Sequence, residues 1–188
     1  MTVDEIFSDM AAHMIKGLMV HDQMVNYYYF LSLDGYAKCH EYHYWCENKS
    51  YAKLTKHYFK YHNKLIKSKN ISNPDLIPQS WYSYERKDVD VSTKRNAVKT
   101  GLEKWLDWEK DTLTLYKKMY EELVNLGEIT DAKMVECLIC DVSEEIAEIH
   151  KYYIKKQTLD FAITDIIADQ HKDKEKYKNK IHEHCCCC

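Results

Sequence analysis

The stretch DWEKDTLTLYKKMYEELVNLGEITDAKMVECLICDVSEEIAEIHKYY, residues 107–153, decides the fold class of this chain. Apolar residues recur along both of its halves at spacings of three and four, which is the pattern of amphipathic helices. Between the halves stands Leu126-Gly127, a typical helix C-terminus because glycine readily adopts the left-handed conformation. The stretch therefore predicts two antiparallel helices joined near Gly127, the first starting after Ser92 and the second ending near Gln157.

Two glutamates occupy inward positions on these otherwise apolar helix faces. Glu109 lies 19 residues before position 128, at the turn, and Glu145 lies 17 residues after it. Two antiparallel helices would therefore hold both carboxylates at about the same height, facing one another. Burying an ionised carboxylate costs several kcal/mol unless it is paired or bound to a cation. We therefore expect the core to stabilise these groups, and a metal ion is the sharpest candidate.

The N-terminal third of the chain predicts a second pair of helices. We expect a first helix over residues 3–45, a turn at 47–50 and a second helix over 50–65, each with an apolar face. Asp34-Gly35 interrupts the first helix and is expected either to kink it or to end it. The predicted fold class is thus all-α, with two helical hairpins in one antiparallel bundle of four helices.

The rest of the chain predicts a crossover, a further helix and a tail. The helical pattern disappears between residues 70 and 90, where both prolines lie, so we expect a long crossover between helices two and three. Residues 1–157 would form the four-helix bundle, residues 158–181 an additional C-terminal helix that docks on it, and residues 182–188 a flexible tail.

The composition excludes several classes of function. A net charge of −3 with scattered lysines gives no sign of a nucleic-acid partner, and no apolar run approaches the roughly 18 residues that cross a bilayer. With only 4 glycines, the chain has no phosphate-binding glycine loop. The N-terminus lacks a signal-peptide core, so we expect a cytoplasmic protein whose 8 cysteines are thiols. The 16 tyrosines favour an interface, and we expect a homodimer or another homo-oligomer, with a protein partner as a further expectation.

The helical pattern and its acidic positions resemble the ferritin-like superfamily. In that superfamily each helical hairpin supplies a glutamate from one helix and a Glu-x-x-His or similar acidic pair from the other, and together they hold two irons. Residues 107–153 resemble the second hairpin, and KHYFKYHNKL, residues 56–65, resembles the part of helix two that carries the histidine. The resemblance implies metal ligands at Glu109, Glu145 and His62, with Asp22 as the candidate on helix one.

Two departures from the family pattern modify this expectation. Phe59 stands three residues before His62, and Ala147 stands three before His150, where the family has glutamates. The sequence therefore predicts a modified centre that holds a single iron or manganese ion, and any oxidoreductase activity of ferroxidase type would be weak. Two hypotheses stay open. One is a ferritin-like metal-binding protein, and the other is a non-enzymatic interaction protein that has kept the bundle and lost its metal, with its carboxylates in a buried polar network.

Two further pairs of residues are secondary candidates for metal binding. His40 and His43 share a helix face at a spacing of three and could chelate an ion; the alternative is that they are ordinary surface and core histidines. Asp141 and Glu148 lie about one helical turn from Glu145, so they could support the same centre.

The C-terminal sequence HEHCCCC is a separate candidate. His182, His184 and Cys185–Cys188 could bind zinc or another soft metal, because thiolates and imidazoles favour such ions. The alternative is a disordered, oxidation-prone end that could cross-link oligomers.

Overall fold

The computed structural model of the chain describes residues 1–67, 69–72, 74, 85 and 89–182, apart from the side chains of residues 179, 181 and 182. Within those residues the chain contains five α-helices and no strand, so the all-α prediction is confirmed. None of these helices combines the length and the apolar character needed to cross a membrane. The helices are α1 (Val3–Phe30), α2 (Asp34–His62), α3 (Val91–Asn125), α4 (Ile129–Thr158) and α5 (Ile163–His182).

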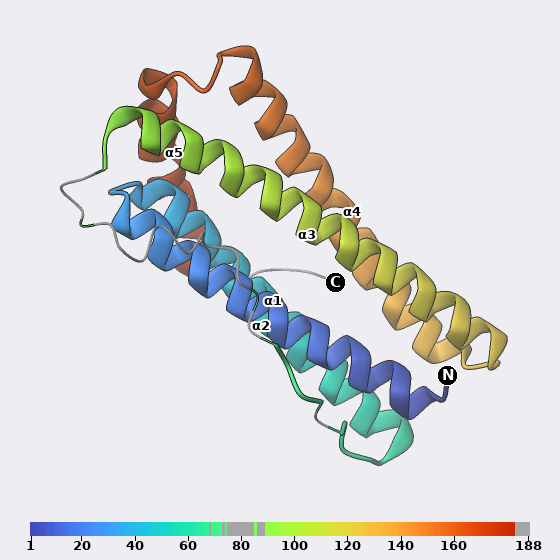
Figure 1. The fold of residues 1–188 in the computed structure, drawn as a ribbon. Coiled ribbons are helices and arrows are strands. Elements are labelled where there is room, and N and C mark those ends of the chain that lie inside the picture. Colours follow the sequence, from blue (N-terminus) through green and yellow to red (C-terminus); the bar gives the residue numbers. More distant parts are fainter. Residues whose placement is uncertain (68, 73, 75–84, 86–88, 183–188) are drawn as a thin grey trace.

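The first four helices form two antiparallel pairs. α1 runs against α2 and α3 runs against α4, and the two pairs lie side by side (Figure 1). α2 ends at one end of the molecule and α3 begins at the other (Figure 1). The expected crossover between them, residues 70–90, lies mostly outside the described residues.

The turn between α1 and α2 lies at Leu31, Ser32 and Leu33, so the predicted first helix over residues 3–45 is wrong. Residues 47–50, the predicted turn, lie inside α2. Ser32 has a φ of 58°, a left-handed conformation that ends the helix without a glycine. Both leucines are buried, at 0% and 1% exposure, and hold the turn against the core. Consequently the first part of α2 packs back along α1 instead of extending it.

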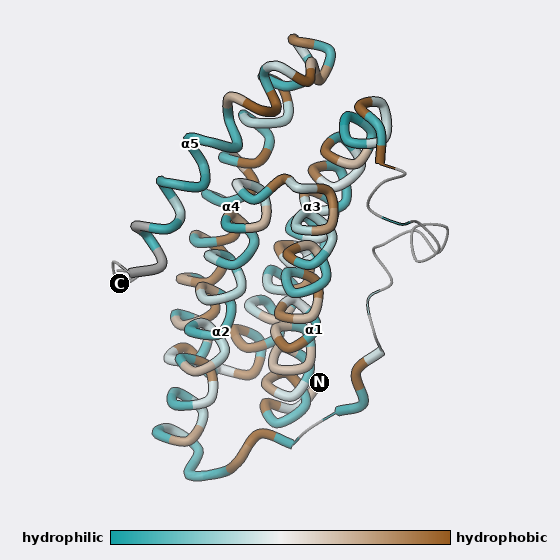
Figure 2. Tube along the Cα trace, turned by 90° about the vertical axis from the view of Figure 1, so that its left-hand side faces the viewer, coloured by the Kyte–Doolittle hydropathy of each residue, from teal (hydrophilic) through white to brown (hydrophobic). Residues whose placement is uncertain are grey.

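α5 packs closely on the start of α2 and on α4. A Cβ on Gly35, at the start of α2, would come within 2.1 Å of the backbone oxygen of Gln170, so this close approach requires glycine. Lys156 of α4 is fully buried, and its Nζ lies 2.6 Å from Asp165 Oδ2 and 2.9 Å from Asp169 Oδ2. Much of α5 is hydrophilic (Figure 2), so these contacts and the buried side chains of Ile166 and Tyr177 are what attach it to the other helices.

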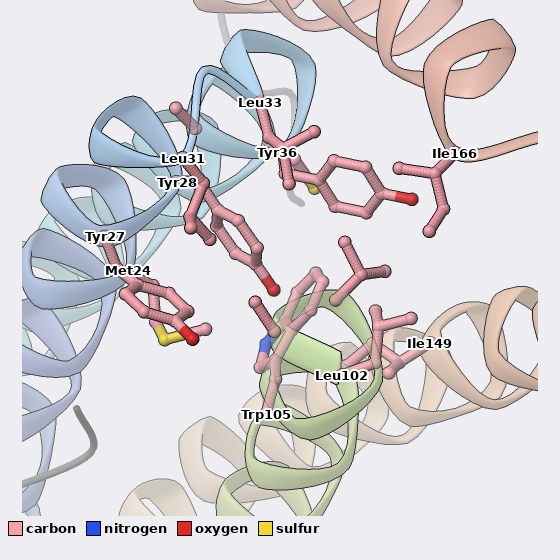
Figure 3. Close-up of a cluster of buried hydrophobic side chains, with 14 of the residues drawn as sticks. Met24, Tyr27, Tyr28, Leu31, Leu33, Tyr36, Leu102, Trp105, Ile149 and Ile166 are labelled. Atoms are coloured by element: carbon pink, nitrogen blue, oxygen red, sulfur yellow. The ribbon is translucent and has the colours of Figure 1, made fainter. Parts of the chain in front are cut away.

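Two hydrophobic clusters fill the interior at different heights. The turn cluster lies near the α1–α2 turn and includes Tyr28, Trp105 and Ile149 (Figure 3). The distal cluster lies at the other end of the helices and includes Phe7 and Leu138. On each of α1 to α4, a stretch of residues that belong to neither cluster separates the members of one cluster from those of the other. These four stretches fall at the same height, and they form a polar layer across the core.

Candidate metal centre

The polar layer receives titratable side chains from four helices. One ligand atom each from His21, Glu109 and Glu145 lies within 4.8 Å of the others. Among the described side chains, these three form the group of histidine and carboxylate ligands that converges closely enough for one ion. The layer consists of His21 on α1, His43 and Glu47 on α2, Glu109 on α3 and Glu145 on α4.

The structure brings Glu109 and Glu145 together, at the height that their distances from the Gly127 turn predict. Glu109 is only 4% exposed. Trp105, one turn earlier on α3, donates a hydrogen bond from Nε1 to Glu109 Oε1 at 3.1 Å. The indole therefore orients this carboxyl group within the core.

His43 and Glu145 form an ion pair between α2 and α4. His43 Nδ1 lies 2.6 Å from Glu145 Oε1, but the geometry is not that of a hydrogen bond, so this buried oxygen has no aligned donor. Burial opposes both charges, yet their mutual attraction raises the pKa of His43 well above its usual value and lowers the pKa of Glu145. The pair is therefore charged at neutral pH, with one carboxylate oxygen incompletely satisfied.

The other two carboxyl groups of the layer hold protons at neutral pH. Burial raises the pKa of Glu109 well above its usual value, and the charge of Glu145 raises it further. Burial likewise raises the pKa of Glu47 to about 8. Glu47 lies against α1 at Gly17, where an added Cβ would come within 2.9 Å of the Glu47 Oε1 atom. A cation in this layer would replace these protons, because it stabilises the ionised carboxylates.

His40 holds the ring of His21 from α2. The Nδ1 atoms of the two buried rings lie 3.0 Å apart. Burial lowers the pKa of His21 to about 3 and the pKa of His40 well below its usual value, so both rings are neutral. When His21 donates its Nδ1 proton to His40, its Nε2 carries a lone pair that is available to a metal.

An acidic cavity of about 370 Å³ opens onto the centre. Glu109 and Glu145 line it together with Asp141, Glu144 and Glu148. Asp141 and Glu148, predicted as secondary ligands, thus lie along the approach to the centre and outside the converging group. Lys49, Lys53 and Lys180 line the cavity as well, so its acids outnumber its lysines without excluding positive charge. The cavity gives a metal ion a route to the core, and its carboxylates would attract the ion.

Two predicted ligands lie away from the centre. Asp22 is exposed on α1, and its neighbour His21 takes the inward position. His62 Nε2 lies 2.9 Å from Asp131 Oδ2, at the far end of α2. His62 follows Glu47 by 15 residues, which is about 22 Å along a helix. The structure therefore does not bring Asp22 or His62 to the converging group. The choice of His62 assumed that helix two begins after residue 50, whereas α2 begins at Asp34.

Correct helix boundaries place different residues in these roles. The α2 contribution is His40-x-x-His43-x-x-x-Glu47, whose spacings of three and four put all three side chains on one helix face. His40 and His43 were predicted as a secondary pair, whereas Glu47 was assigned to a turn. His21 was missed, although it follows Gly17 by four residues on the buried face of α1. The side chains of His182 and His184 and the residues Cys185–Cys188 lie outside the described part of the chain.

Comparisons with known proteins give no family for this chain. No protein-family model matches it, and no curated protein sequence matches it. The geometry and chemistry of the polar layer therefore carry the functional interpretation.

Proposed function

We propose that this chain is a ferritin-like metal-binding protein that holds one iron or manganese ion in the polar layer. His21, Glu109 and Glu145 are the proposed ligands. The convergence of their ligand atoms within 4.8 Å is the observation that carries the proposal. The ferritin-like assignment is supported by two antiparallel helix pairs, and by a second helix that ends at the opposite end of the molecule from the start of the third (Figure 1).

The residues present fit an ion of this kind. Metal–ligand bonds of about 2.1 Å place neighbouring ligand atoms about 3–4 Å apart, so small side-chain rotations would bring the three groups onto one ion. One imidazole with two carboxylates is a donor set that suits iron, manganese and zinc. The Oε1 atom of Glu145, buried without an aligned donor, is the kind of atom that a cation would satisfy.

The charge of the layer supports the same proposal. Glu47, Glu109 and Glu145 are three acids that face one charged imidazole, His43, so at neutral pH two of the acids keep their protons. A divalent cation would supply the missing positive charge and release those protons. Metal affinity should therefore increase with pH.

The protein's own residues orient and supply the centre. Trp105 fixes Glu109, His40 fixes the tautomer of His21, and the acidic cavity leads cations inward. Bound iron or manganese would supply Lewis acidity and one-electron redox chemistry at this position. We propose metal binding as the function, because a single converging group of three ligands is a poor match for a two-ion ferroxidase.

A metal-free interaction protein is the second candidate. It is favoured by exposed aromatic side chains of α2, since Trp45, Phe59 and Tyr61 are all more than half exposed. Phe59 and Tyr61 lie on different sides of the helix, and such exposed rings suit contact with a protein partner, for which we propose a second copy of this chain. In this case the His43–Glu145 ion pair and the protonated glutamates would form a structural network.

Metal analysis separates the two candidates. The full chain is purified without an affinity tag, with His182, His184 and Cys185–Cys188 replaced by serine in every variant so that the tail binds nothing. We expect about one iron or manganese ion per chain, and none in the double variant Glu109→Gln/Glu145→Gln. Glu121→Gln/Glu136→Gln, which changes exposed glutamates on the same two helices, is the matched control. A metal-free parent chain that rebinds neither ion would refute the proposal.

A further inference from the structure

A second cavity, of about 470 Å³, also reaches the polar layer and shares His43 and Glu145 with the acidic cavity. Its inner end is formed by His40, His43 and Glu145, so it meets the candidate metal centre directly. α4 forms one of its walls, and Tyr177 of α5 contributes another. A volume of this size lies within the range of about 300–1,000 Å³ that is usual for small-molecule sites.

The walls of this cavity are aromatic and aliphatic. Tyr36, Leu102, Trp105 and Ile149 line it from three helices, and Figure 3 shows these four side chains within the turn cluster. Tyr152 adds a further ring, whose centroid lies 6.2 Å from that of Tyr36 in an edge-on arrangement. Flat aromatic ligands pack well between such side chains.

The polar groups at the outer part of the cavity are already paired. Tyr152 Oη lies 3.1 Å from Tyr36 Oη and 3.2 Å from Asp173 Oδ2. Of the three lysines that line the cavity, Lys155 bonds Asp169 at 2.7 Å, Lys176 lies over the ring of Tyr177, and Lys151 is exposed. Two of the three lysine charges thus have partners within the protein, which favours an uncharged ligand over an anion.

The inner end differs, because it offers both hydrogen-bond partners and charge. The imidazole of His40 and the carboxylate of Glu145, whose Oε1 atom has no aligned donor, both line the cavity there. A hydroxyl group on a ligand can donate to such a carboxylate and accept from an imidazole N–H. The inner end therefore suits the polar end of a molecule whose body is apolar.

We propose that this cavity binds a neutral aromatic molecule of about two fused rings, with its rings between Tyr36, Trp105 and Ile149 and its hydroxyl group at the His40–Glu145 end. The assignment of this cavity as the substrate pocket of the metal centre rests on the proposed function. Binding of the aromatic ligand to the cavity itself does not require metal. The centre would then have two approaches, an acidic one for the cation and an aromatic one for the organic ligand.

The first test measures 2-naphthol binding to the full chain after metal removal with EDTA. Isothermal titration should give one site with a dissociation constant near 100 µM, or about 10⁻⁴ M, which is reasonable for a ligand of this size. Ile149→Phe fills the cavity and should weaken binding at least about tenfold. Ile146→Phe adds the same atoms to the same helix at a position outside the cavity lining, and it should leave the affinity within about twofold.

Two controls keep this test decisive. If Ile149→Phe fails to fold by circular dichroism, nuclear Overhauser contacts between naphthol and the rings of Tyr36 and Tyr152 in the unmodified chain take its place. Their presence supports the cavity assignment and their absence overturns it. Naphthalene-2-sulfonate tests the charge: tighter binding of the sulfonate than of 2-naphthol would overturn the assignment of a neutral ligand.

The second test relates the cavity to the metal. Mn²⁺ is paramagnetic, so Mn²⁺ bound in the centre should broaden the NMR signals of bound naphthol, whereas Zn²⁺ should not. Broadening that disappears in Glu109→Gln/Glu145→Gln supports a shared site. Bound Mn²⁺ without broadening overturns the substrate-pocket assignment. Naphthol binding to a chain that takes up neither Mn²⁺ nor Fe²⁺ refutes the proposed function alone and supports the cavity.

Discussion

α2 meets α4 through histidine and a buried carboxylate at two heights, and the two places differ in how completely the carboxylate is satisfied. At the far end of α2, Asp131 is 1% exposed, and its two oxygens lie 2.7 Å from His57 Nε2 and 2.9 Å from His62 Nε2. In the polar layer, Glu145 has one short contact, to His43, and its Oε1 atom has no aligned donor.

The difference separates a structural network from a binding site. One carboxylate shared by two imidazoles uses both of its oxygens, so the Asp131 group joins the helices without further help. The polar layer has more acids than cations, and it keeps Glu47 and Glu109 neutral through protonation. We infer that the Asp131 group stabilises the fold, whereas the polar layer is arranged for a cation that the protein binds from outside.

The largest expected effect comes from removing Asp131. Asp131→Ala leaves His57 and His62 without their shared acceptor, and breaking a buried pair of this kind costs about 3 kcal/mol of unfolding free energy. Glu109→Gln in the polar layer should change the stability of metal-free protein by less than about 1 kcal/mol, because Glu109 is already protonated. Urea unfolding measures both, with the exposed Asp111→Ala on α3 as control. Equal losses from Asp131→Ala and Glu109→Gln would remove the distinction between the two places.

The next effect is stabilisation by metal. At Mn²⁺ concentrations about 100 times the dissociation constant, the unfolding free energy should rise by about 2.7 kcal/mol. Glu145→Gln should lose this increase, since it removes a proposed ligand. Asp131→Asn should retain it, although the variant starts from a lower stability. Thermal unfolding with and without Mn²⁺ decides the question, and a loss in Asp131→Asn would show that the two places are not independent.

Substitution of His40 should have a smaller effect on metal binding, because His40 acts on the metal only through His21. His40→Phe keeps a ring beside Trp105 and removes the partner of His21 Nδ1, so the dissociation constant for Mn²⁺ should rise about tenfold. His13→Phe is the matched control, since His13 is another partly buried histidine, and its Nε2 lies 2.7 Å from Thr112 Oγ1 outside the polar layer. Equilibrium dialysis gives both constants. Equal affinities in the two variants would exclude a positioning role for His40.

The pH dependence of stability gives a further test. Folding raises the pKa of Glu47 from 4.5 to about 8, so the folded chain binds more protons than the unfolded chain between these values. The stability of metal-free protein should therefore fall as pH rises through this window, and Glu47→Gln should flatten the curve. Metal affinity should change in the opposite direction, by up to about tenfold per pH unit for each proton released. Thermal midpoints from pH 5 to pH 8 test the slope, with Glu136→Gln as a control that should not alter it.

The sequence alone was sufficient to predict the second helix pair, α3 and α4. Gly127 marks its turn because glycine takes a φ of 79° there without strain, and counting from this turn correctly places Glu109 opposite Glu145. The all-α class follows from the same periodicity. These features depend on local signals, which a single sequence carries.

The first helix pair could not be predicted in the same way. Its turn at Leu31–Leu33 has a serine in the left-handed conformation and is held by two buried leucines, so tertiary packing determines it. Because the turn was placed at residues 47–50, Glu47 was not considered as a core residue, and His62 was assigned the position on helix two beside Glu145 that His43 occupies. On α1 the acidic Asp22 was preferred to His21, although His21 lies on the buried face.

The close packing of α5 on Gly35 also has a consequence for the order of assembly. Gly35 and Gln170 are 135 residues apart in the chain, so this contact forms only after α5 has been synthesised. The ligands on α1, α3 and α4 precede α5, and the acidic cavity opens mainly between α2 and α4. We therefore expect nascent chains to acquire the polar layer first and the Tyr177 wall of the aromatic cavity afterwards.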